Sequence, residues 1–292
     1  MSGGLVKTLM DPGQTLAALR AAPLSTGDFL KNRLAPKERR DVGNNLLLAY
    51  EHVPPADRIC FFDISVTPGT NGELHQLHIE PQVQSATLQS GKIFKTAKRL
   101  KPIFYLPYRK NGTTRMKLAQ PPGWGGGEVK FFATATIDGC SVYIEGPATS
   151  PKVTHANANA VQPTLATDTF LQKTAKINAK ILDMDTRLGH VKKGPAVVVE
   201  RPNYMVEDPL LVQAAKQQFA AWKNIPVAQV TAYSPFGAVV GVKSGGSWTF
   251  YMQKNGAFDH VPPGGGVADR SYMVLDAIEV FPNGAGMVRL LP

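Results

Sequence analysis

Two cysteines and six histidines are the residues of this chain that could support nucleophilic catalysis. Covalent attack on an amide needs a thiolate, a base that accepts the thiol proton, and a third group that orients the base. Cys60 lies in an apolar run, so we expect a small buried hydrophobic side chain there. Cys140 follows Asp138-Gly139, a strong hairpin signal that predicts a hairpin between the strands at 128–137 and 140–145. Such a turn can expose a thiol and direct backbone N–H groups at a bound carbonyl. Cys140 is therefore the stronger candidate nucleophile.

His155 is the histidine best placed to act as the base. It follows Cys140 in the chain after a Gly146-Pro147 reversal, and a hairpin of this length can bring His155 onto a strand beside the cysteine. A sulfur within about 4 Å of a ring nitrogen, in an accessible cleft, would favour an enzyme. Side chains that point apart or are fully buried would favour a binding module with a structural cysteine.

The residues around this pair resemble the catalytic core of the Burkholderia lethal factor-like and cytotoxic necrotizing factor-like glutamine deamidase toxins. The similar stretches are FFATATIDGC, which ends at Cys140, and KVTH, which ends at His155. The family pattern has a threonine or another polar residue, then a turn of a small residue, glycine and cysteine, and a histidine further along the chain. Thr134 stands six residues before Cys140, which is the position of the threonine in the lethal factor.

This resemblance implies a protein-glutamine deamidase, which is a hydrolase. Cys140 would attack the side-chain amide carbon of a glutamine in a host protein and form a thioester. His155 would take the thiol proton and pass it to the departing ammonia, Thr134 would help to hold the imidazole, and the backbone N–H of Cys140 would stabilise the oxyanion. Water would then release glutamate, and neither a metal nor an organic cofactor would be needed.

The resemblance also implies a biological setting. It indicates a secreted bacterial effector, a virulence toxin that acts in the host cytosol. Its substrate would be a translation-initiation helicase, with inhibition of translation as the result, or a GTPase of the Rho group. The first ten residues carry no apolar run followed by a small-residue cleavage site, so we expect no Sec signal peptide.

Two departures from the family pattern concern the chemistry of the thiol. Asp138 stands where the family usually has serine, and a carboxylate near the sulfur would oppose thiolate formation unless it points away. The interval from Cys140 to His155 is longer than in the lethal factor and matches the necrotizing factors. The same pair could also serve a transglutaminase, with an amine in place of water, or a cysteine protease, with a backbone amide as substrate. A basic, β-rich binding module without catalytic activity is the third alternative.

The elements that must position these residues are mostly short strands. Runs of β-branched and aromatic residues between Gly and Pro clusters predict strands, and apolar residues at helical spacing predict helices. The predicted strands cover residues 58–66, 73–80, 92–94, 102–108, 128–137, 140–145, 152–156, 196–200, 238–242, 247–252 and 271–281. The predicted helices cover residues 15–20, 44–50, 169–188 and 209–223. The pattern favours an α+β fold, in which sandwich-like packed mixed sheets are flanked by helices.

The length and net charge of the chain bear on its domain organisation and its partners. The chain has 292 residues and a net charge of +10, which favours an acidic partner. The basic residues are scattered rather than interleaved with aromatic residues, so we expect no specific nucleic-acid binding. We expect a monomer without a membrane span, composed of a helical and loop-rich N-terminal extension at residues 1–50 and a deamidase-like catalytic domain at residues 51–292. The pair His75 and His78 lacks further ligands at suitable spacing, so no zinc site is expected.

Overall fold

A computed structural model describes most of the chain from residue 101 onward and three segments before it. The described residues are 7–25, 59–67, 74–81, 101–107, 111–120, 128–158, 165, 167–189, 195–262, 264–284 and 289–291. For residues 59–67, 74–81, 101 and 289–291 the description covers the backbone alone.

Two β-sheets form the framework. The eight-stranded sheet has the order β1 (Leu24–Ser25), β3 (Leu74–Pro81), β2 (Ile59–Thr67), β4 (Lys101–Leu106), β6 (Phe131–Thr134), β10 (Val230–Ser244), β11 (Ser247–His260) and β12 (Asp269–Phe281). It is mixed, because β1 with β3 and β4 with β6 are parallel pairs. The five-stranded sheet has the order β13 (Arg289–Leu291), β9 (Ala196–Val199), β7 (Ser141–Glu145), β8 (Lys152–Ala156) and β5 (Thr113–Lys117).

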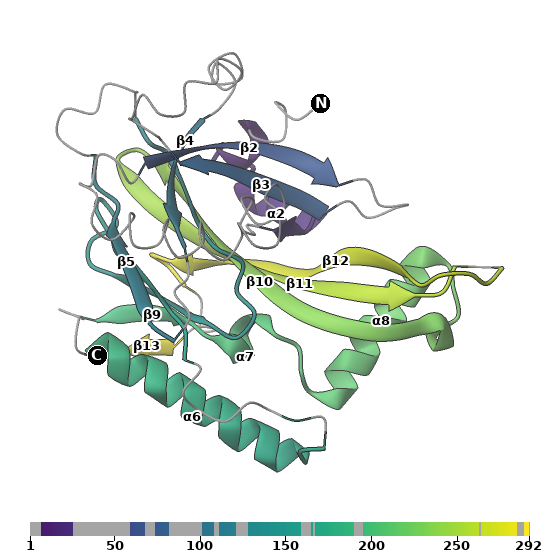
Figure 1. The fold of residues 1–292 in the computed structure, drawn as a ribbon. Helices are drawn as coiled ribbons and strands as arrows, with labels where there is room; N and C mark the ends of the chain where they lie inside the picture. Colours follow the sequence, from purple (N-terminus) through teal and green to yellow (C-terminus); the bar gives the residue numbers. More distant parts are fainter. Residues whose placement is uncertain are drawn as a thin grey trace, which may run out of the picture.

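The helices are α2 (Thr15–Ala21), α6 (Phe170–Gly189), the short α7 (Arg201–Tyr204) and α8 (Pro209–Lys223), with a 3-10 turn, η4 (Val227–Gln229), after the last of them. The longer helices lie outside the space between the two sheets, whereas α7 adds Tyr204 to the apolar cluster between them. Figure 1 shows α6 along the five-stranded sheet and α8 beside the far end of the long strands β10 and β11. Packed mixed sheets flanked by helices confirm the predicted α+β class.

The two sheets pack face to face through an apolar cluster, which we call the interlayer core. The eight-stranded sheet contributes residues such as Phe104, Leu106, Phe132, Val239 and Trp248, and the five-stranded sheet contributes Val142, Ile144, Val153 and Val199. Side chains alternate between the faces of a strand, so Tyr143 of β7 points the other way and packs with Met184 and Leu188 of α6. Every residue of β7 is buried for this reason, including Ser141 and Glu145 at its two ends.

The predicted hairpin at Asp138-Gly139 is wrong. The strand before it, β6, pairs with β4 and β10 in the eight-stranded sheet, whereas β7 pairs with β8 and β9 in the five-stranded sheet. The chain therefore crosses from one sheet to the other at this turn, where Gly139 has a φ of +137°. An isolated bridge between Ile137 and Gly237 holds the chain as it leaves the first sheet. The strand predicted for 128–137 is accordingly shorter, at Phe131–Thr134.

The two longest strands, β10 and β11, contain glycines and are longer than predicted. The predicted strands 238–242 and 247–252 extend to Val230–Ser244 and Ser247–His260. Gly256 lies within β11 because a Cβ there would come within 2.6 Å of the Phe258 ring and 2.7 Å of the Tyr233 ring. Strand β5 was not predicted, and the predicted strand 92–94 and helix 44–50 lie outside the described residues.

The first described segment is part of the core. Helix α2 packs Leu19 against Ala277 of β12 and the neighbouring strands. The buried Gln253 donates hydrogen bonds to the carbonyls of Leu19 and Ala22, and it accepts one from the N–H of Leu24. Residues 7–25 of the expected N-terminal extension are therefore integrated into the fold, and residues 26–50 lie outside the described part.

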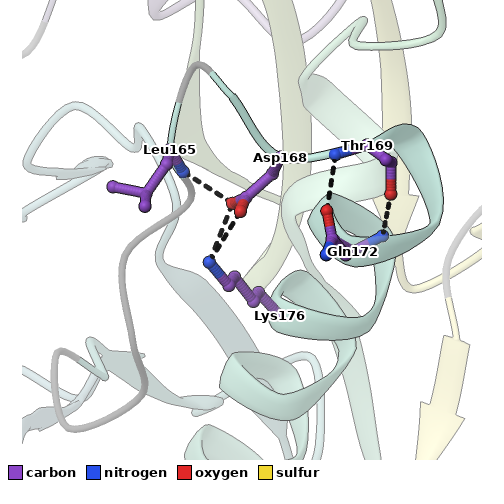
Figure 2. A network of polar contacts seen from close by, with 5 residues as sticks. All are labelled: Leu165, Asp168, Thr169, Gln172 and Lys176. Carbon is purple, nitrogen blue, oxygen red and sulfur yellow. Dashed lines mark hydrogen bonds and ion pairs between the residues drawn. The ribbon is translucent and has the colours of Figure 1, made fainter.

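A polar network fixes the start of α6 (Figure 2). Thr169 and Gln172 form a reciprocal capping box, in which each side chain accepts a hydrogen bond from the backbone N–H of the other residue. The Asp168 carboxylate accepts hydrogen bonds from the N–H of Leu165 and from Lys176 Nζ, and the Lys176 contact keeps the pKa of Asp168 below its usual range. The start of α6 is thus stabilised locally, while Met184 and Leu188 are the residues that bury its other end.

Candidate active site

The hairpin of β7 and β8 brings Cys140 and His155 to one face of the five-stranded sheet. Val142 lies directly opposite His155 in the antiparallel ladder, and directly opposite residues share a face. Cys140 precedes Val142 by two residues and joins it in the interlayer core. The thiol and the imidazole are therefore diagonal neighbours that face the other sheet.

Both side chains are buried. Cys140 is 2% exposed and His155 is 0% exposed, so the accessible thiol expected from the turn is not present in this conformation. The pair thus points to the same side, as an enzyme requires, but it lacks the open cleft that sequence reasoning attached to the enzyme.

The turn before the thiol is held by a tyrosine from α7. The Tyr204 hydroxyl accepts a hydrogen bond of 2.9 Å from the N–H of Gly139 and donates one of 2.8 Å to the carbonyl of Cys140. Burial raises the pKa of this hydroxyl well above its usual value, so it stays protonated and keeps both roles. The Gly139 N–H is consequently occupied, which leaves the Cys140 N–H as the backbone donor proposed for an oxyanion.

The sulfur of Cys140 is neutral at physiological pH. Burial raises the pKa of its thiol to about 11. The hydrogen bond from Asn157 Nδ2, at 3.2 Å from Sγ, opposes that rise, as do the backbone of Asp138 and the charge of Lys180. The Asp138 carboxylate raises the pKa further, which is the effect expected when aspartate replaces the family's serine.

The imidazole of His155 is neutral as well. Burial lowers its pKa to about 4, and a hydrogen bond involving the backbone of Leu106 partly offsets this effect. Leu106 is the last residue of β4 in the opposite sheet. The base is therefore in the unprotonated form that can accept a proton.

Thr134 faces the same interlayer region from β6, where it pairs with Leu106 in the parallel ladder. Its side chain is fully buried, and its hydroxyl donates a 2.8 Å hydrogen bond to the carbonyl of Ala135. Within the described residues, the backbone of Leu106 rather than the Thr134 hydroxyl acts on the His155 ring. Thr134 thus lies beside Leu106, the residue whose backbone raises the pKa of His155.

Sequence reasoning missed three groups of this site. Asn157 could have been found, because a residue two positions after His155 on a strand shares its face. Tyr204 and the Leu106 carbonyl could not, because long-range packing brings both of them to the hairpin. Leu106 acts through its backbone, and the residue type does not reveal such a role.

Other candidate groups have structural roles or fall outside the described part. Asp183 pairs with Arg187 at 3.1 Å on the surface of α6, and Asp185 accepts a hydrogen bond from the Tyr143 hydroxyl. The side chains of His75 and His78 are outside the described residues. Among the side chains that are described, no cluster of three or more His, Cys, Asp or Glu could hold a metal ion. The described helices also include none that is long and apolar enough to cross a membrane.

No protein-family model matches the chain, and no curated protein sequence matches it.

Proposed function

We propose that this protein is a cysteine–histidine hydrolase that deamidates a glutamine side chain of another protein. Sγ of Cys140 attacks the amide carbon while its proton passes to a ring nitrogen of His155. The protonated imidazole gives that proton to the leaving nitrogen, so ammonia departs and a thioester remains. Water, deprotonated by the same imidazole, then attacks the thioester, which releases glutamate and restores the thiol.

The observation that carries the proposal is a pair of strongly perturbed titratable groups inside an otherwise apolar layer. Burying a histidine and a thiol there costs free energy, because both polar groups lose water. Leucine or valine would fill the same space without that cost. Strongly shifted pKa values cluster at functional sites, and burial is the largest cause of the shifts at Cys140 and His155.

The protonation states favour general-base activation. With a thiol pKa of about 11 and an imidazole pKa of about 4, the proton belongs on sulfur at pH 7. The base can therefore accept the proton as the sulfur attacks, without a preformed thiolate–imidazolium pair. The site must open and uncover the sulfur before the substrate binds. A thiol that is 2% exposed suits a slender side-chain amide better than a peptide backbone, which supports deamidation over proteolysis.

The net charge of +10 supports an acidic protein as the substrate. The resemblance to the deamidase toxins adds a host translation-initiation helicase as the first candidate and a Rho-group GTPase as the second. On the same basis we propose a secreted bacterial effector that acts in the host cytosol.

Burial of both side chains favours a second candidate, a basic binding module in which Cys140 is structural. In that case His155 would stabilise the interlayer core by its contact with Leu106, and the net positive charge would serve binding alone. The two candidates differ in one respect that can be measured, which is chemical conversion that depends on Cys140.

A proteome-wide search for Gln-to-Glu conversion tests the proposal. Eukaryotic cell lysate is incubated with the protein, with Cys140→Ala and with Cys140→Ser, and peptides are compared by mass spectrometry. We expect one or a few sites that are converted by the intact protein alone. Cross-links or new termini that depend on Cys140 would instead establish a transglutaminase or a protease, and the absence of any Cys140-dependent product would favour the binding module.

A further inference from the structure

Asn157 is the polar side chain in hydrogen-bond contact with the candidate nucleophile. Its Nδ2 donates to Sγ of Cys140 at 3.2 Å. The ladder of β7 and β8 ends at the pair Ser141 and Ala156, so Asn157 stands opposite Cys140 one step beyond it. Asn157 is half-buried, whereas His155 is fully buried. The sulfur therefore lies between a base deep in the interlayer core and an amide on its outer side.

The orientation of this amide is determined by its other contacts. Oδ1 of Asn157 accepts a 3.0 Å hydrogen bond from the N–H of Asn111, and the backbone N–H of Asn157 donates to the carbonyl of Gly112 at 2.9 Å. Because the oxygen is engaged by a backbone donor, the nitrogen of the amide must face the sulfur. This assigns the donor role to Asn157 and leaves the sulfur as acceptor.

A chain of polar contacts links this amide to α6. Asn111 has a φ of 53°, a left-handed conformation that asparagine tolerates. The guanidinium of Arg187 holds it there by donating to its carbonyl at 2.8 Å and to its Oδ1 at 3.0 Å, and Asp183 pairs with the same guanidinium. The contacts therefore run from Arg187 through Asn111 and Asn157 to the thiol.

We propose that Asn157 is the positioning residue of Cys140: it holds the sulfur in place and stabilises the negative charge that develops there as the proton leaves for His155. This inference rests on the proposed function. Two charged groups also act on the sulfur: the Asp138 carboxylate opposes a negative charge there, and Lys180 favours it. A neutral amide donor suits this position because it supports a thiolate without holding the sulfur in a permanent ion pair.

The test measures the reactivity of the thiol, which needs no substrate. Full-length protein is treated with iodoacetamide between pH 7 and 9.5, and the adduct on the Cys140 peptide is quantified by mass spectrometry. Asn157→Leu removes the donor at similar size, and Asn157→Asp replaces it with a carboxylate oxygen. We expect alkylation at a given pH to fall about tenfold for Asn157→Leu, since a hydrogen bond to a charged group is lost, and further for Asn157→Asp.

Two further variants keep the test decisive. Arg187→Gln acts from the outer end of the chain of contacts and should slow alkylation about threefold, because Asn111 loses its guanidinium partner. Asn224→Asp adds the same charge as Asn157→Asp, but at the C-terminal cap of α8, and it should alkylate like the unmodified protein. After unfolding in urea all variants should react alike, which excludes a change in the reagent or the peptide.

The outcomes separate this inference from the proposed function. Alkylation rates and pH profiles that remain unchanged in Asn157→Leu, Asn157→Asp and Arg187→Gln would overturn the positioning role while leaving Cys140 as a competent nucleophile. A Cys140 that resists iodoacetamide up to pH 9.5 in every folded variant, yet reacts in urea, would overturn both, because the thiol would then be closed in solution.

Discussion

Among the side chains that the structure describes, two histidines are buried, and their surroundings differ. His155 faces the interlayer core beside the thiol of Cys140. His260, at the end of β11, is 5% exposed and lies 3.1 Å from the Ser271 hydroxyl, with its ring 5.4 Å from that of Phe219. Burial lowers the pKa of both. Burial alone therefore does not distinguish a base from a packed histidine, and the neighbouring groups must.

The neighbours of His260 are those of a structural side chain. Its ring packs in a satellite cluster under α8, where Phe219 stacks on Phe258 at 4.3 Å. The carboxylates of Asp269 and Asp259 oppose the lowering of its pKa. Within the described residues the cysteine side chain lies beside His155 and not beside His260, so under the proposed function His155 is the candidate base.

Removing each imidazole in turn is the strongest test of whether His155 and His260 have different roles. In the lysate assay, His155→Gln should reduce Gln-to-Glu conversion by at least about 10³-fold, because the thiol loses its proton acceptor. His260→Gln should stay within about twofold of the unmodified protein. Loss of conversion in His260→Gln alone would reverse the assignment and make the contact between Ser271 and His260 the candidate site.

Acid stability should show the next largest difference. The pKa of His155 is about 4 in the folded protein, against 6.5 as its ordinary value, so the unfolded chain binds this proton first. The free energy of unfolding should therefore fall by about 3 kcal/mol as the pH drops from 6.5 to 4, and no further below pH 4 on account of this group.

Urea unfolding measured from pH 7 to pH 4 checks this expectation. His155→Gln should remove most of that fall, whereas His260→Gln should retain it, since the carboxylates near His260 limit its shift. Other acidic groups titrate alike in both variants, so they cancel in the comparison. An equal pH dependence in the two variants would mean that His155 is solvated in solution.

The sequence predicted the candidate pair better than it predicted the connection between the strands that carry it. Strand β8 begins and ends where its alternation indicated, at Lys152–Ala156, because it is short and bounded by Pro151 and polar residues. The Asp138-Gly139 turn failed as a hairpin signal because local turn chemistry does not specify the sheet that the next strand joins. That choice depends on pairing with β9, which lies far along the chain.

Burial of the site was also beyond the reach of sequence patterns. A cysteine after an Asp-Gly pair suggested exposure, but one face of β7 packs against the eight-stranded sheet, and Cys140 is buried on that face with Val142 and Ile144. The long strands β10 and β11 were shortened in prediction because Gly237 and Gly256 weaken the strand pattern. In the fold, Gly237 leaves room for Tyr204, whose ring carbons would lie 2.8 Å from a Cβ there.

The smallest expected effects are on stability, and they compare the Tyr204 contacts beside Cys140 with an ion pair near His260. Tyr204→Phe keeps the ring but leaves the Gly139 N–H and the Cys140 carbonyl without their shared partner. Both groups lie in or beside a buried turn, so the free energy of unfolding should fall by about 2 kcal/mol. Near His260, Arg270→Ala removes an ion pair whose side chains are 53% and 27% exposed, and it should cost less than about 1 kcal/mol. Urea unfolding at pH 7 measures both; a larger loss for Arg270→Ala would show that the Cys140 turn is held by its backbone and the interlayer packing, not by the Tyr204 hydroxyl.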